Sequence, residues 1–140
     1  MKILITGGAG FIGCNAADRF LQRGDHVTIF DNLSRRGVNS NLDWLRTRHG
    51  PDSFRLMQAD VRDAHSLLSA ARDQEVIIHL AGQVAVTTSV ADPRADFESN
   101  AIGTFNALEA ARLSGPNPIF LYSSTNKVYG GMDDVMLTEG

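Results

Sequence analysis

Short apolar runs alternate with longer stretches of helical periodicity from the first residue to about Ser123. The short runs are rich in β-branched residues and predict strands at Lys2–Thr6, His26–Phe30, Phe54–Gln58, Val76–Leu80 and Ile119–Tyr122. The longer stretches predict helices at Phe11–Arg23, Asn41–His49, Ala64–Arg72 and Asp96–Leu113. Because alternating strands and helices are typical of a parallel sheet, the pattern predicts an α/β, doubly wound fold with strand order 3-2-1-4-5.

The same pattern predicts which faces are buried. Val76–Leu80 is almost entirely apolar, as expected of a central strand that helices cover on both sides. In the second helix, Leu42 and Leu45 are expected to point inward. In the first helix one face collects five apolar residues and is expected to be buried: Phe11, Ala16, Ala17, Phe20 and Leu21.

Composition limits the classes of function. A chain of 140 residues that is 43% apolar suits one globular domain and excludes two full ones. The net charge of -3 without long runs of like charge gives no electrostatic basis for binding nucleic acid. No apolar run approaches the roughly 18 residues of a membrane span, so we expect no membrane partner and a cytoplasmic location. Cys14 is alone and lacks metal-ligand partners, so we expect a core thiol and no metal site.

The sequence Thr-Gly-Gly-Ala-Gly-Phe-Ile-Gly, residues 6–13, lies where the first strand gives way to the first helix. Glycines there permit a tight turn and a close approach of the backbone to a pyrophosphate, which the helix N-terminus attracts. Gly13 is expected to let the helix pack closely on the strand. With Asp31 about 20 residues further on, the pattern predicts a dinucleotide site.

Asp31 also bears on the choice of dinucleotide. Its carboxylate can accept hydrogen bonds from an adenosine ribose, and its charge opposes a 2′-phosphate. This favours NAD over NADP. Arg35 and Arg36 leave the alternative open, because either could meet a 2′-phosphate or simply be solvated in a loop.

Two further segments leave predicted strands at the same edge of the sheet. Asp60 could accept from an adenine amino group beside Val61, or Asp60 or Asp63 could cap the next helix. Residues 80–83, Leu-Ala-Gly-Gln, are small enough for a ribose or nicotinamide to lie against their backbone. His79 is interpreted as a hydrogen-bonded core histidine rather than a base.

Hydroxyl and amide side chains extend this set. Residues 83–89 predict a loop that could line a substrate pocket through Thr87 and Thr88, although Thr88 or Ser89 could instead cap a helical turn. Asn100 is an unfavourable residue inside a helix and needs polar partners. Three consecutive hydroxyls at the end of the fifth strand could hydrogen-bond an alcohol or ketone: Ser123, Ser124 and Thr125.

In their order along the chain, these segments resemble the extended short-chain dehydrogenase/reductase family, the NAD-dependent nucleotide-sugar epimerases and dehydratases. The resemblance covers residues 6–13, 31–34, 60–62, 79–82, 100–104 and 123–130. It implies a Rossmann domain over residues 1–130 and the start of a truncated loop over residues 131–140. It implies that NAD takes a hydride from the sugar and returns it. Within the family, residues 83–89 and 123–130 favour a CDP-sugar and epimerisation at C2.

The resemblance also implies roles for individual residues. Thr125 is the expected catalytic hydroxyl, and Thr87, Thr88 and Ser124 are expected to bind substrate. The residues expected to contact NAD are Gly7, Gly10, Phe11, Ile12, Asp31, Asn32, Ser34, Arg35, Asp60, Val61, Leu80, Ala81, Gly82, Gln83, Asn100 and Ser123. A homodimer through the helix Asp96–Leu113 is expected for the full-length form.

One element of the family pattern is missing. Members carry Tyr-x-x-x-Lys, in which the lysine lowers the pKa of the tyrosine. Here Tyr122 is followed four residues later by Asn126, and Tyr129 by Asp133. We therefore expect a cofactor-binding N-terminal part of an epimerase. Two alternatives stay open: a non-catalytic NAD-binding module, and a UDP-sugar 4-epimerase or dTDP-sugar 4,6-dehydratase.

Overall fold

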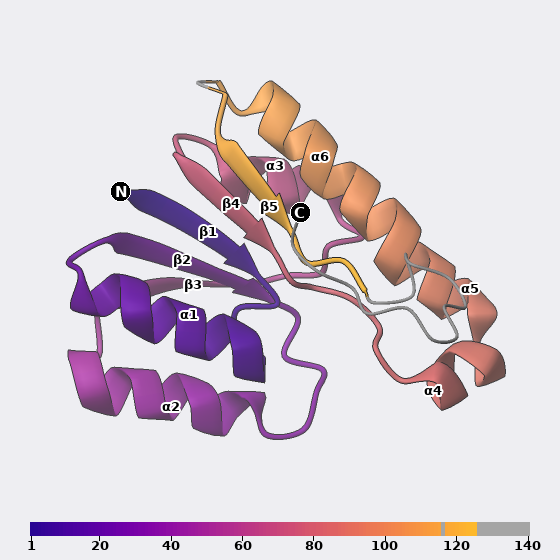
Figure 1. Cartoon of the computed structure of the whole chain (residues 1–140), viewed down its shortest axis with the longest axis horizontal. Coiled ribbons are helices and arrows are strands. Elements are labelled where there is room, and N and C mark those ends of the chain that lie inside the picture. The colour runs from indigo at the N-terminus through magenta and orange to yellow at the C-terminus, as the bar shows by residue number, and fades with distance from the viewer. Residues whose placement is uncertain (116, 126–140) are drawn as a thin grey trace, which may run out of the picture.

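A computed structural model describes residues 1–115 and 117–125. Its centre is an all-parallel sheet in the order β3-β2-β1-β4-β5, with helices on both faces (Figure 1). The predicted α/β doubly wound fold and its strand order are confirmed. The strands are β1 (Lys2–Thr6), β2 (His26–Asp31), β3 (Phe54–Gln58), β4 (Val76–His79) and β5 (Ile119–Tyr122).

The helices differ more from the sequence prediction than the strands do. Predicted ends were off by one to three residues at several helices, as is usual for frayed termini. The helices are α1 (Phe11–Gln22), α2 (Val38–His49), α3 (Ala64–Ala71), α4 (Val86–Ala91), α5 (Pro93–Phe97), a π-helix η1 (Glu98–Ile102) and α6 (Gly103–Leu113).

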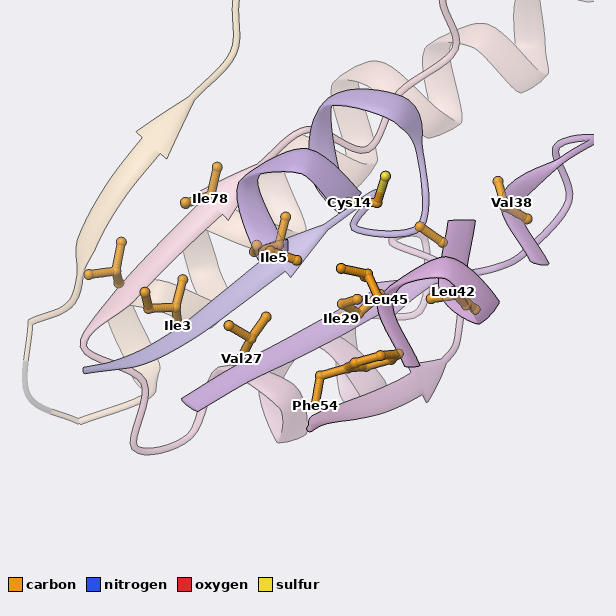
Figure 2. Packing of buried hydrophobic residues seen from close by; sticks show 13 residues of the cluster. Ile3, Ile5, Cys14, Val27, Ile29, Val38, Leu42, Leu45, Phe54 and Ile78 are labelled. Carbon is orange, nitrogen blue, oxygen red and sulfur yellow. The ribbon is translucent and has the colours of Figure 1, made fainter. Parts of the chain in front are cut away.

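Two apolar clusters hold the three layers together. One lies between the sheet and the helices α1 and α2, where Leu42 and Leu45 point inward as predicted and Cys14 is buried (Figure 2). The other lies between the sheet and the helices α3 and α6. The β4 strand is buried along its whole length, as expected of a strand covered on both faces.

Three predictions about the helices and the loop before them were wrong. Phe11 was expected in the core, but its side chain is 80% exposed. It is the first residue of α1, directly after the N-cap Gly10, and it lines the cleft described below. The helix predicted at Asp96–Leu113 is three successive elements, and residues 83–89 contain the start of α4 instead of a loop throughout. Their hydroxyl and short side chains gave no clear helical period.

The α6 helix buries a stripe of small and polar residues, Gly103, Asn106, Ala107 and Ala110. Its larger apolar residues, Phe105 and Leu108, are mostly exposed. The small residues allow α6 to pack closely on α3 and on the turn before it, where a Cβ on Gly103 would lie 2.7 Å from Val61 Cγ2. Phe105 and Leu108 therefore face away from this domain's core.

The predicted boundary at residue 130 and the predicted loop over residues 131–140 lie outside the described residues. Both stay predictions, as do the positions of Asn126 and Tyr129. Within residues 1–115 and 117–125, no helix is long and apolar enough to cross a bilayer.

Candidate functional site

The glycine-rich turn brings three backbones into contact. Gly7 has a φ of +67°, and a Cβ there would lie 2.8 Å from the backbone nitrogen of Ala81. A Cβ on Gly13 would collide with the carbonyl oxygen of Gly7 and lie 2.6 Å from Gly8 Cα. Gly13 was predicted to let the helix pack closely on the strand; in the structure, the residues that its Cβ would meet are Gly7 and Gly8, in the turn directly after β1. Only glycine at both positions allows β1, α1 and the end of β4 to approach this closely.

The N-terminus of α1 is left without a side-chain cap. Gly10 is its N-cap residue, and no acidic residue lies in the first turn. A Cβ on Gly10 would meet only the Gly7 carbonyl oxygen, at 3.1 Å, so this position is otherwise open. Because the first N–H groups of a helix lack intrahelical acceptors and carry a partial positive charge, this end can bind an anion such as a pyrophosphate.

Asp31, at the end of β2, is held by two backbone donors. Its Oδ2 accepts from the N–H of Ala9 at 3.1 Å, and its Oδ1 accepts from the N–H of Leu33 at 2.9 Å. The first bond fixes the carboxylate against the glycine-rich turn. Since an ionised carboxylate can accept about four hydrogen bonds, each oxygen of Asp31 keeps capacity for a diol.

A denser cluster lies at the end of β3. Asp60 accepts hydrogen bonds from the side chain and backbone of Arg62 and from Asn32 Nδ2. The bonds from Arg62 hold the pKa of the Asp60 carboxyl far below its ordinary value. Asp63, not Asp60, caps α3, accepting from the N–H groups of His65 and Ser66. Asp60 is therefore free of the capping role that the sequence left open.

Asn100 lies in the π-helix η1 and fixes the segment that follows β4. Its Oδ1 accepts from the N–H of Gln83 at 2.8 Å, and its Nδ2 donates to the Gln83 carbonyl oxygen at 3.2 Å. Nδ2 also donates to Asp96, which accepts from the Ser89 hydroxyl. The polar partners predicted for Asn100 are thus a backbone segment and a carboxylate. Through these bonds the Asn100 amide positions the wall of the site.

His79 is buried, and both ring nitrogens are hydrogen-bonded. Nδ1 pairs with the Thr6 hydroxyl at 2.7 Å and Nε2 with the Thr104 hydroxyl at 3.1 Å. Burial lowers the pKa of the ring to about 4. The ring is therefore neutral at pH 7, and the interpretation of His79 as a satisfied core residue is confirmed.

These groups line one cleft of about 870 Å³ at the carboxyl edge of the sheet, within the size range of small-molecule sites. Every residue expected to contact NAD lines it, together with Ser124 and Thr125. Thr87 and Thr88 do not; they are exposed on α4. The structure thus brings together all but two of the predicted site residues, and their individual roles stay predictions.

Sequence reasoning missed several supporting residues. Asn106 of α6 donates to the carbonyl oxygens of Val61 and Arg62, at 3.0 and 3.2 Å, and so braces the turn after β3. Thr104 holds His79, and Asp96 links Ser89 to Asn100. A buried polar residue in an otherwise apolar helical stripe, as at Asn106, was the available signal.

A parallel five-stranded sheet with an uncapped glycine-rich turn and a carboxylate after the second strand defines a Rossmann-like dinucleotide-binding domain. The model of the GDP-mannose 4,6 dehydratase family matches residues 4–140. The chain belongs to this family of epimerases and dehydratases.

The relatives of the chain include epimerases and dehydratases. The chain is 44% identical to CDP-paratose 2-epimerase of Salmonella typhi, over 99% of the chain and 41% of the relative. It is 34% identical to UDP-glucose 4-epimerase of Klebsiella pneumoniae, over 99% of both. The chain spans about two fifths of the length of most of these curated relatives.

Solved structures of epimerases and dehydratases also match the fold of this chain. A UDP-glucose 4-epimerase from Stenotrophomonas maltophila, with bound NAD and formylated UDP-arabinopyranose, matches with a TM-score of 0.86 and 29% identity over 98% of this chain and 40% of its own. A dTDP-glucose 4,6-dehydratase from Streptomyces venezuelae with bound NAD matches with a TM-score of 0.84 and 32% identity, over 98% of this chain and 43% of its own.

Proposed function

We propose that the chain is the NAD-binding part of a nucleotide-sugar epimerase. The observation that carries this proposal is the pairing, in one cleft, of the uncapped α1 terminus with the oriented Asp31 carboxylate. The first suits a pyrophosphate and the second a ribose diol. The solved structures with bound NAD support this cofactor. When bound, NAD supplies the hydride acceptor and donor for the sugar.

The proposal assigns each wall of the cleft to one part of the cofactor. Gly7, Gly10, Phe11 and Ile12 contact the pyrophosphate, and Asp31, Asn32, Ser34 and Arg35 surround the adenosine ribose. Asp60 and Val61 face the adenine. The nicotinamide half lies along Leu80, Ala81, Gly82, Gln83, Asn100 and Ser123. The fit rests on the close backbone approaches that glycine permits at the turn and on the unused acceptor positions of Asp31.

Binding of NAD and NADP tests the cofactor assignment. The Asp31 carboxylate opposes a 2′-phosphate, so NAD binds at least about tenfold more tightly than NADP. Asp31→Asn keeps the shape of the side chain, removes its charge and narrows this difference. Isothermal titration calorimetry measures both affinities. Tighter binding of NADP than of NAD by the unchanged protein would overturn the assignment.

The substrate we propose is a CDP-sugar, epimerised at C2. The identity of 44% to a CDP-paratose 2-epimerase supports it. Thr125 is the proposed catalytic hydroxyl, with Ser124 beside it at the end of β5; both line the cleft. Thr87 and Thr88 are proposed to bind substrate from α4. A panel of CDP-, UDP- and dTDP-sugars, followed by chromatography of the products, tests this. Turnover of UDP-sugars alone would favour a 4-epimerase.

A non-catalytic NAD-binding module is the second candidate. Its basis is that residues 1–140 do not contain the family's Tyr-x-x-x-Lys: Asn126 lies four residues after Tyr122, and Asp133 lies four residues after Tyr129. Incubation of the protein with NAD and a CDP-sugar separates the two candidates. Any epimerised product excludes a purely binding role.

We also propose a homodimer, formed through α5 and α6. Phe97, Phe105 and Leu108 are 58, 60 and 48% exposed, and clustered exposed apolar side chains mark interaction surfaces. Sedimentation velocity measures the oligomeric state of the unchanged protein and of two variants. Phe105→Asp should be monomeric, whereas Val90→Asp, on α4, should remain a dimer. A monomeric wild-type protein overturns this proposal. The cytoplasmic location stays a prediction from the sequence.

A further inference from the structure

The Asp60 carboxylate receives four hydrogen bonds, each of 2.9 Å. Its Oδ1 accepts from the backbone N–H and Nε of Arg62. Its Oδ2 accepts from Nη2 of Arg62 and from Nδ2 of Asn32. An ionised carboxylate offers about four acceptor positions. All of them are therefore occupied, three by one arginine.

Arg62 is itself held by residues of η1 and α6. Its Nη1 lies 3.6 Å from Oε2 of Glu98 in η1. Its carbonyl oxygen, and that of Val61, accept from Asn106 of α6. Because both its backbone and its guanidinium are held, Arg62 sets the plane of the Asp60 carboxylate as well as its charge. A bidentate guanidinium imposes this geometry, which a lysine cannot.

The four donors on Asp60 are not equivalent. Three come from Arg62, and two of these are the charge-assisted, bidentate pair, the stronger kind of hydrogen bond. The fourth comes from the neutral amide of Asn32, whose Oδ1 accepts from the N–H of Ser34 in the exposed loop after β2. The Asn32 donor is thus the one that a ligand can replace at least cost.

We propose that Arg62 is a positioning residue that determines specificity for the nucleotide base. It orients Asp60 so that an N–H group of the base can replace Asn32 as the donor to Oδ2. This inference rests on the proposed cofactor function. Since the carboxylate only accepts hydrogen bonds, the position admits the exocyclic amino group of adenine. A base with an oxo group at that place, such as hypoxanthine, brings a second acceptor next to the carboxylate, and no hydrogen bond forms between them.

The test compares NAD with nicotinamide hypoxanthine dinucleotide, in which a 6-oxo group and an N1–H replace the 6-amino group and the unprotonated N1 of adenine. Calorimetry gives the two dissociation constants, and their ratio is the readout. The unchanged protein binds NAD about tenfold or more tighter, the size expected of one hydrogen bond to a charged group. In Arg62→Ala the ratio falls below about threefold, because Asp60 is no longer oriented.

Two further variants separate orientation from charge and from general stability. Arg62→Lys keeps the charge but not the bidentate geometry, and its ratio also falls. Arg112→Ala removes an arginine paired with Glu109 on α6, away from Asp60, and keeps the ratio. A merely structural role for Arg62 lowers both affinities together and leaves the ratio unchanged, which overturns the inference.

The outcomes also distinguish this inference from the proposed function. If the unchanged protein binds neither dinucleotide, the cofactor proposal fails, and this inference fails with it. If it binds both equally, the base position is wrong while the cofactor proposal stands. If the ratio is large in the unchanged protein and persists in both Arg62 variants, Asp60 selects the base without help from Arg62.

Discussion

Two helices begin at the same edge of the sheet, and their first turns are built in opposite ways. The N-cap of α1 is Gly10, without a side chain to accept from the first N–H groups. The N-cap of α3 is Asp63, whose carboxylate accepts from the N–H groups of His65 and Ser66. Both helices follow a parallel strand, so their positions alone do not explain the difference.

The contrast separates a ligand-binding helix start from a structural one. A capped terminus has satisfied its own donors, and its negative charge already meets the helix dipole. An uncapped terminus keeps both its donors and its partial positive charge for an external anion. Of these two helices only α1 is uncapped and begins in the cleft, so the proposed pyrophosphate site is at α1 and not at α3.

Gly13→Val is expected to have the largest effect. The new Cβ would collide with the Gly7 carbonyl oxygen and with Gly8, both backbone groups that cannot turn away. We expect a loss of about 3 kcal/mol or more in the free energy of unfolding. Urea denaturation followed by circular dichroism measures it. Gly10→Ala is the control, because its Cβ meets a single oxygen at 3.1 Å; equal stability of the two variants would contradict the packing argument.

Gly10→Asp turns the start of α1 into a copy of the start of α3. The extended backbone of Gly10, with φ of -69° and ψ of 173°, suits an N-cap residue. The added carboxylate caps the helix and repels a pyrophosphate. We therefore expect the affinity for NAD to fall about a hundredfold, with little loss of stability.

The matched control is Gly10→Asn, which can cap the helix without adding charge. Calorimetry should give it a smaller loss of NAD affinity than Gly10→Asp. If both variants bind NAD as tightly as the unchanged protein does, the pyrophosphate does not lie at this terminus, and the contrast between the two helices loses its functional meaning.

A pH experiment tests the support beneath the α1 turn, where His79 joins Thr6 of β1 to Thr104 of α6. Burial lowers the pKa of His79 from 6.5 to about 4 in the folded protein. The folded protein disfavours the charged ring. The free energy of unfolding is therefore unaffected by His79 above pH 6.5, and it decreases as the pH falls from 6.5 toward 4. At pH 5 we expect a loss of about 2 kcal/mol.

Two measurements check this loss. Urea unfolding at several pH values gives its size, and NMR titration of the His79 ring assigns it to that group. A ring that titrates near 6.5 in the folded protein would refute the explanation.

The sheet was predictable because each strand is short, apolar and flanked by turn residues, so local sequence and the packed fold favour the same structure. The π-helix was not predictable. Asn100 forms its hydrogen bonds to Gln83, 17 residues earlier, and no local periodicity encodes that contact. The prediction for Phe11 was wrong for a related reason. Its spacing fits the buried face of α1, but as the first residue of the helix it is exposed at the cleft.

The cleft was predictable where chemistry depends on backbone geometry, as at Gly7 and Gly13, because few other residues can stand there. The cleft was less predictable where its geometry depends on hydrogen bonds between side chains and distant parts of the chain. Asn106 contacts Val61 and Arg62 from 45 and 44 residues away. Such contacts arise only when α6 packs on the sheet, and the sequence contains their residues but not their distances.

The smallest effect is expected at the capped helix, for Asp63→Ala. The change removes the acceptor for the N–H groups of His65 and Ser66, so the free energy of unfolding should fall by about 1 kcal/mol. The affinity for NAD should stay as it is, because Asp63 does not line the cleft. Asp43→Ala, which removes an exposed carboxylate from the middle of α2, controls for charge. Weaker NAD binding in Asp63→Ala alone would mean that the two helix starts are coupled, and that α3 also contributes to the anion site.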